Sequence, residues 1–133
     1  MNDNLDIIIP PHLYDEYLFE EYIINTVKPL LFITNISCLL NITTEYFTDY
    51  CDTVLSKYSH ESYIWTIVCN GKPENASHSV KTVLYVANLM SSKFQNSFEK
   101  IHFQSPHKCI HKALYEEWSK IPCHLKNIIV ISN

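Results

Sequence analysis

The segment from Ser77 to Lys93 constrains the fold of this chain more than any other, because it is apolar around most of a helix. At 100° per residue, its polar positions fall on one narrow stripe formed by Lys81, Asn88 and Ser92. A helix this apolar is buried either in a large core or in a membrane. The segment is short and interrupted for a bilayer span. We therefore predict the buried central helix of a helical bundle.

The bulk composition fits one small globular domain and argues against several classes of function. The chain has 133 residues, of which 47% are hydrophobic and 18% are charged, so a core is expected. Its net charge is −4 and it has no arginine, which argues against nucleic-acid binding and against a phosphate-handling enzyme. The single glycine, Gly71, excludes a glycine-rich phosphate loop and disfavours a sheet built from tight hairpins.

The cysteines and the chain ends indicate a cytosolic setting. Five cysteines without a secretory signal predict reduced thiols. No stretch of about 18 apolar residues occurs, so no full membrane span is predicted. We expect residues 1–12 to form a flexible arm, which Pro10-Pro11 separates from a single helical domain at residues 13–133.

The other segments are also predicted to be helical. Leu30–Ile42 is apolar nearly throughout and is interpreted as a buried helix, because no other segment is expected to pair with it. Thr44–Tyr58 has a clean amphipathic stripe with Thr43 or Thr44 as its cap. The fold class predicted is all-α, with about seven helices around a central hydrophobic one. The further predicted helices are Leu13–Val27, Glu61–Cys69, Gln95–Phe103, one starting at Ser105-Pro106, and Leu125–Ile131.

A small zinc or thiol enzyme is one alternative, and it rests on a group of histidines and cysteines. His107 and His111 stand four residues apart, as two ligands of one zinc ion do, but Cys109 falls on the apolar side of their helix. Cys123-His124 would have to supply the remaining ligands. Seven histidines make chance Cys–His pairs common, and no pair of carboxylates indicates acid–base chemistry. We predict no metal, no cofactor and no enzymatic activity.

Aromatic residues and one lysine point instead to binding. Exposed tyrosines beside apolar side chains, such as Tyr46 and Tyr50, suit a groove that accepts an amphipathic helix, although Tyr50 is equally well interpreted as a core residue. Lys81 lies near the start of the central helix, where the helix dipole does not favour a cation. It is either poised for an acidic partner or simply an exposed lysine.

Three segments resemble a known family. Ser77-His78-Ser79-Val80-Lys81-Thr82-Val83-Leu84 resembles the opening of the central helix in poxviral Bcl-2-like proteins, especially the myxoma-type mitochondrial inhibitors of apoptosis. Residues 38–46 and 50–55 resemble the helices that precede it. The likeness covers about residues 37–100 and implies a Bcl-2-like bundle.

The resemblance also implies a function and a site. Family members hold the BH3 helix of pro-apoptotic proteins such as Bax, Bak and Bim in a hydrophobic groove. Lys81 stands where the cellular pattern Asn-Trp-Gly-Arg has its arginine, while the three residues before it do not match that pattern. The groove residues implied here are Tyr46, Tyr50, Val54, Ile67, Lys81 and Leu84.

Partners and location follow from the same resemblance. We expect BH3 motifs of host proteins as partners, no nucleic acid, and a monomer or homodimer in the host cytoplasm. Family members usually carry a membrane tail, so either an anchor is missing after Ile128-Ile129-Val130-Ile131 and the protein reaches the mitochondrial outer membrane, or this member is soluble. The alternative function is a scaffold of the same fold that suppresses innate NF-κB signalling without binding BH3 helices.

Overall fold

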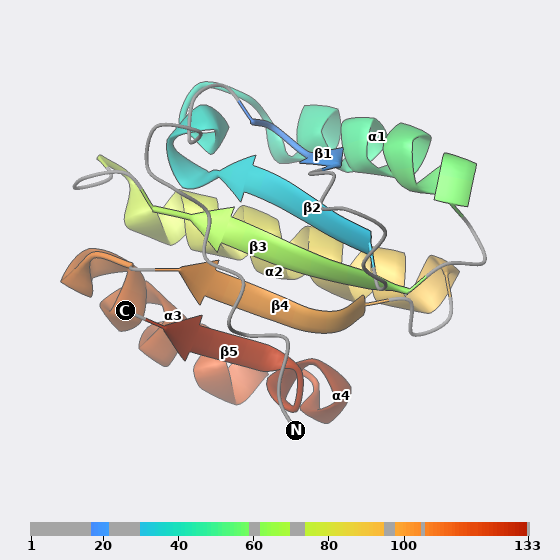
Figure 1. Ribbon diagram of the computed structural model, residues 1–133. Helices are drawn as coiled ribbons and strands as arrows, with labels where there is room; N and C mark the ends of the chain where they lie inside the picture. The colour runs from blue at the N-terminus through green and yellow to red at the C-terminus, as the bar shows by residue number, and fades with distance from the viewer. Residues whose placement is uncertain are drawn as a thin grey trace.

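The computed structural model describes residues 17–21, 30–58, 62–69, 74–94, 98–104 and 106–132, and it is an α/β fold (Figure 1). The predicted all-α bundle of about seven helices is therefore wrong. Five strands form one sheet in the order β1-β2-β3-β4-β5. The strands are β1 Glu20–Glu21, β2 Leu30–Asn35, β3 Tyr63–Val68, β4 Phe98–Gln104 and β5 Ile129–Ser132. The helices are α1 Thr44–Leu55, α2 Ala76–Lys93, α3 Lys108–Glu117 and α4 Cys123–Lys126.

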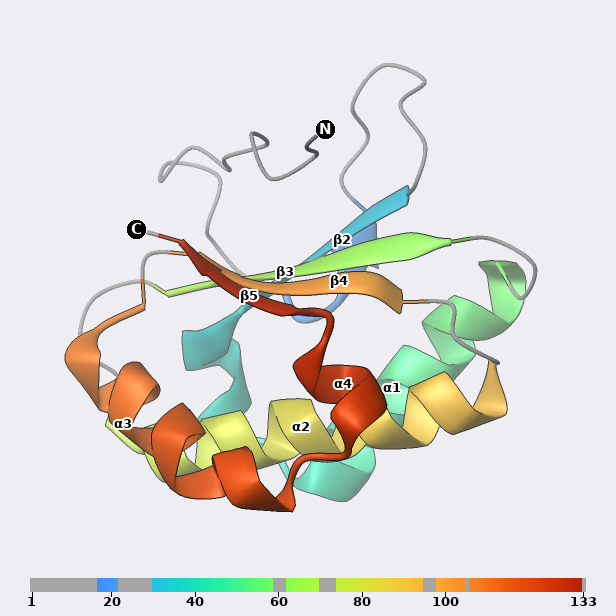
Figure 2. The ribbon, with the colours of Figure 1, turned by 90° about the horizontal axis from the view of Figure 1, so that it is seen from below.

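The order of the strands across the sheet follows their order in the sequence. β2, β3, β4 and β5 are parallel neighbours, and β1 is antiparallel to β2. Crossovers between parallel strands are right-handed, so a strand order that never reverses returns each connecting helix to the same face. Figure 2 shows this arrangement, with α1, α2, α3 and α4 all on one side of the sheet.

Five segments predicted to be helices contain strands: β1 lies within Leu13–Val27, β5 overlaps Leu125–Ile131, and the other three segments hold the central strands. Leu30–Ile42 contains β2 and a 3-10 helix at Ile36–Leu39, Glu61–Cys69 contains β3, and Gln95–Phe103 overlaps β4. The cause is burial on both faces: strands in the middle of a parallel sheet are apolar without alternation. All six residues of β3 are buried, so its pattern has no period that separates a strand from a buried helix.

The face of the sheet that carries the helices holds the main core. Trp65 lies at its centre, fully buried between Phe47 and Phe98. Its Nε1–H donates to Thr34 Oγ1 at 2.8 Å, and Thr34 Oγ1 donates to the Leu18 carbonyl at 2.6 Å. The indole N–H of Trp65 and the hydroxyl of Thr34 therefore both have partners, as burial of a polar group requires. The opposite face is buried as well, through Leu31, Ile33, Ile64, Thr66, Val68, His102 and Gln104.

Two predicted helices are confirmed. α2 covers the predicted central helix, with Asn75 as its N-cap, and its exposed positions include Lys81, Asn88 and Ser92. α1 covers most of Thr44–Tyr58, and Thr43 caps it by accepting a hydrogen bond from the Tyr46 N–H at 3.0 Å. Both predictions rested on local pattern and caps, which do not depend on the neighbours of the helix.

The C-terminal third differs in detail from its prediction. The helix expected at Ser105-Pro106 begins at Lys108, with His107 as its N-cap. Leu125–Ile131 is divided between α4 and β5. Within the described residues, no helix combines the length and apolar character that crossing a bilayer needs. The predicted arm at residues 1–12 lies outside the described residues.

Candidate functional site

The structure does not bring the six predicted groove residues to one surface. Ile67 is fully buried in β3 on the helix-covered face, and Leu84 is 9% exposed on α2. Tyr46 is exposed on α1 and stacks on Tyr50 with ring centroids 6.5 Å apart. Val54, also on α1, is half-buried against the core. These residues belong to two layers of the fold, so they do not line a common helix-binding groove.

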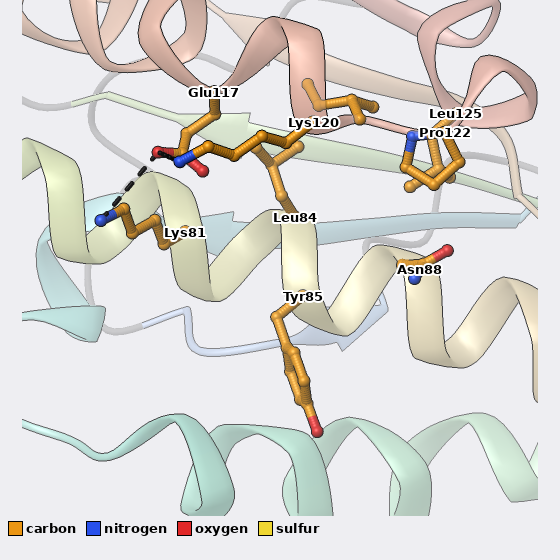
Figure 3. Close-up of a pocket in the computed structure, with 9 residues that line it drawn as sticks. Lys81, Leu84, Tyr85, Asn88, Glu117, Lys120, Pro122 and Leu125 are labelled. Atoms are coloured by element: carbon orange, nitrogen blue, oxygen red, sulfur yellow. Dashed lines mark ion pairs between the residues drawn. The ribbon is translucent and has the colours of Figure 1, made fainter.

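Lys81 lies at a pocket between α2 and the segment formed by residues 117–125 (Figure 3). Its Nζ is 4.0 Å from Glu117 Oε2, and Lys120 Nζ approaches the same oxygen at 3.8 Å. The Glu117 side chain is only 17% exposed, whereas the two lysines are 58% and 71% exposed. Lys81 therefore has an acidic neighbour within its own chain. Exposed pairs at such distances contribute about 0–1 kcal/mol, so the pocket is weakly organised.

Tyr85 also lines this pocket, and its ring extends toward α1 (Figure 3). There it borders a hollow that is lined on the α1 side by Thr44, Glu45, Thr48 and Asp49. The two carboxylates make this hollow acidic. An incoming BH3 aspartate would meet like charge there, which opposes binding between α1 and α2.

The candidate zinc and thiol residues do not converge. His107 caps α3 through its own side chain, with Nδ1 accepting from the Cys109 N–H at 3.1 Å. His111 and Cys123 are exposed. In the described part of the chain, no group of three or more His, Cys, Asp or Glu side chains is placed to hold a metal ion.

One histidine–serine pair lies at the carboxyl end of the sheet. His102 on β4 is hydrogen-bonded through Nε2 to Ser132 Oγ on β5, as in Ser/His nucleophile pairs. However, His102 is 1% exposed, and burial lowers its pKa from the usual 6.5. Among the described residues, no carboxylate is hydrogen-bonded to its other ring nitrogen. We therefore assign the pair a structural role in joining β4 to β5.

A different surface stands out beside β5, where α3 ends. Tyr115, Trp118 and Ile131 are 84%, 38% and 40% exposed, although large apolar side chains are usually covered. They line a mainly apolar groove of about 570 Å³, together with His111, Lys112 and Leu114. We call this surface the β5 groove. Of the described residues that line it, Lys112 alone carries a formal charge.

The backbone of β5 leaves hydrogen-bonding groups open beside this groove. In the described sheet β5 is an edge strand that pairs only with β4. The Ile101 N–H donates to the Ile128 carbonyl at 2.9 Å. Backbone groups alternate in direction along a strand, so Val130 also bonds to β4, whereas the N–H and C=O of Ile129 and Ile131 point outward. β5 therefore offers two donors and two acceptors to another strand.

Comparisons with known proteins found no match for this chain: no protein-family model matches it, and no curated protein or solved structure is significantly similar to it.

The sequence does contain a signal for the strand beside the β5 groove: Ile128-Ile129-Val130-Ile131 is β-branched throughout, as edge and core strands often are. That signal was assigned to a helix, so the open edge was missed.

Proposed function

We propose that this protein is a non-enzymatic recognition domain that binds an extended, partly apolar segment of another protein in the β5 groove. One observation carries the proposal. An edge strand with outward-pointing hydrogen-bonding groups lies directly beside exposed Trp118 and Tyr115. Peptides that add to a sheet edge use this combination: backbone hydrogen bonds provide affinity and a side-chain pocket provides selectivity.

The topology supports a binding role over a catalytic one. Open α/β sheets bind substrates and cofactors where the strand order reverses, because the helices there switch faces and open a crevice. In this sheet the order follows the chain from β1 to β5, and the described helices share one face. The feature that usually positions such sites is missing from the described strands.

The BH3-binding function implied by the resemblance is not part of this proposal. It requires a groove between the helices of an all-α bundle, and the sheet replaces that bundle. The NF-κB scaffold shares the same predicted fold and loses the same support. Inhibition of apoptosis and suppression of innate signalling stay predictions, as do the mitochondrial and cytoplasmic locations.

Trp118 is a built-in reporter for the proposed binding. The chain has two tryptophans, and Trp65 is fully buried, so a ligand in the β5 groove changes the fluorescence of Trp118 alone. The probe is a short synthetic peptide with a central Leu between Thr residues, titrated into the full-length chain. We expect a blue shift of emission on binding, and calorimetry with Trp118→Ala should show at least a tenfold loss of affinity, about 1.4 kcal/mol.

A matched control distinguishes binding in the β5 groove from nonspecific binding to exposed aromatic side chains. Tyr46 is 55% exposed on α1, away from β5, so Tyr46→Ala should bind the peptide with unchanged affinity. Equal losses in both variants, or no binding to the unmodified chain, would contradict the proposed function.

A further inference from the structure

We propose that the segment recognised in the β5 groove is acidic, with carboxylates two residues before and after its apolar anchor. This inference rests on the proposed function and adds the chemistry of the partner. Alternate residues of an extended strand point to the same face. If the apolar anchor of the bound segment contacts Trp118, the residues two positions before and after it therefore point to the same face as the anchor. The carboxylates would then reach the lysines on α3 and α4, which are on the same side of the sheet.

The charge of the chain is unevenly divided. Residues 106–132, which supply α3, α4 and β5, contain four lysines and two glutamates, for a net charge of +2. The whole chain carries −4, so residues 1–105 carry −6. The β5 groove therefore belongs to the basic part of an acidic protein. Complementary charge of this kind favours one partner over another and speeds encounter.

The contacts of individual side chains show that positive charge also predominates at the groove itself. Lys112 lines the groove, and Lys126 Nζ lies 5.8 Å from the centre of the Trp118 ring. Of the two glutamates, Glu117 already faces Lys81 and Lys120. Glu116 is exposed and opposes part of the positive charge. The lysines at the groove thus keep an excess of positive charge for an incoming carboxylate.

A second copy of the chain is a poorer occupant. Symmetric pairing of two β5 strands would bring the groove lysines of both copies, Lys112 and Lys126, close together, and the repulsion of like charges makes this unfavourable. Head-to-tail pairing would need the opposite edge, and β1 there has only two residues. Its carboxylates are already engaged, because Tyr50 donates to Glu20 and Tyr58 donates to Glu21, each at 2.8 Å.

The test compares three synthetic peptides that differ only at the positions flanking a central Leu. The sequences are Thr-Glu-Thr-Leu-Thr-Glu-Thr and the same peptide with Gln or Lys in place of Glu. Affinities for the full-length chain are measured by Trp118 fluorescence and calorimetry at low and high salt. We expect the Glu peptide to bind at least tenfold more tightly than the Lys peptide at low salt, with a smaller difference at high salt because of screening.

Charge reversal provides the matched variants. Lys112→Glu should remove or invert the preference for the Glu peptide. Lys57→Glu alters another exposed lysine, beyond the end of α1, so it should leave the preference unchanged. A loss of preference in Lys57→Glu as large as that in Lys112→Glu would overturn the assignment to this groove.

The outcomes distinguish this inference from the proposed function. Equal binding of the Glu, Gln and Lys peptides, still dependent on Trp118, would overturn the acidic partner and leave the recognition domain standing. No binding of any peptide would overturn both. Sedimentation that shows a dimer, with Trp118 shielded as the dimer forms, would overturn the acidic partner in favour of a second copy.

Discussion

The two edges of the sheet differ in the features that control pairing with other chains. β1 is two residues long, and both residues are glutamates whose carboxylates accept hydrogen bonds from tyrosines of the α1 region. β5 is uncharged, lies beside exposed Trp118 and Tyr115, and presents the backbone of Ile129 and Ile131 outward. Short, charged edges resist the addition of further strands, whereas long or apolar edges invite it.

This difference indicates that only the β1 edge is protected against the addition of another strand. The same chain protects the β1 edge with charge and partly buried hydrogen bonds, whereas the described residues give the β5 edge neither. Edge strands in monomeric proteins commonly carry charge to prevent aggregation. The absence of such protection at β5, next to a groove that fits a side chain, is why we assign recognition to this edge.

Proline substitutions at two neighbouring positions of β5 should give the largest difference in stability between two variants. Val130→Pro removes an N–H that bonds to β4, and should lower the free energy of unfolding by about 1–3 kcal/mol because a carbonyl of β4 loses its donor. Ile131→Pro removes an outward N–H, so it should be tolerated far better but should abolish strand addition. Urea denaturation measures the first effect and peptide titration the second. Similar losses of stability in both variants would contradict the direction assigned to these backbone groups.

The helices were predictable because their signals are local. α2 followed from an apolar pattern around the helix and α1 from an amphipathic stripe with a threonine cap. The strands were not recognised because their partners are distant in sequence: Phe32 pairs with Trp65 and Trp65 with Ile101. Residue type carried some information, since every residue of β3 is β-branched or aromatic. Periodicity alone favoured a buried helix.

The site was less predictable than the fold. The exposure of Lys81 was foreseen, but its neighbour Glu117 is on another helix and could be found only in three dimensions. Trp118 was assigned to the apolar face of its helix, yet that helix ends beside an edge strand, which leaves the ring 38% exposed. The β-branched run at residues 128–131 indicates a strand, but whether that strand lies at an edge depends on the order of the whole sheet, which no local sequence pattern shows.

The closed edge should depend on Tyr50. Tyr50→Phe removes the hydroxyl that donates to Glu20, and should lower the free energy of unfolding by about 1 kcal/mol at neutral pH, because a half-buried carboxylate loses a donor. The matched control is Tyr115→Phe, since that side chain is 84% exposed and should tolerate the change without loss. Urea unfolding curves measure both, and a loss in Tyr115→Phe equal to that in Tyr50→Phe would contradict the account of this edge.

The same tyrosine gives an alkaline pH dependence. Burial and the Glu20 carboxylate raise the pKa of Tyr50 from 10.0 to about 12. The folded state therefore holds this proton more tightly than the unfolded state, so its stabilising effect is complete below pH 10 and is lost as the pH rises toward 12. Tyr50→Phe should show a shallower decline over that range. The buried Cys51 and Cys69, whose pKa values are also raised, act equally in both proteins.

An acidic pH dependence should arise next to the open edge. Burial lowers the pKa of His102 below 6.5, so the unfolded state binds the proton more readily. The contribution of His102 to stability is therefore complete above pH 6.5 and is lost as the pH falls below it. His102→Gln, which keeps a donor for Ser132, should flatten this decline in urea unfolding curves measured across the range. His111→Gln, at an exposed position, should not flatten it.

Closing the open edge should have the smallest effect on stability. Ile131→Lys gives β5 a charge of the kind that protects edges, and should change the free energy of unfolding by less than about 1 kcal/mol because the side chain is already 40% exposed. Binding of the Gln-containing peptide, which has no charge for the new lysine to attract, should nevertheless fall, since the groove loses one apolar wall. A variant that binds as tightly as the original chain would show that Ile131 does not line the recognition surface.

Amide hydrogen exchange along β5, followed by NMR with and without the Glu-containing peptide, reports strand addition residue by residue. We expect the amides of Ile129 and Ile131 to exchange rapidly in the free protein and slowly in the complex, whereas the amide of Val130 is protected in both. Unchanged exchange at Ile129 and Ile131 in the peptide-bound protein would contradict strand addition at this edge.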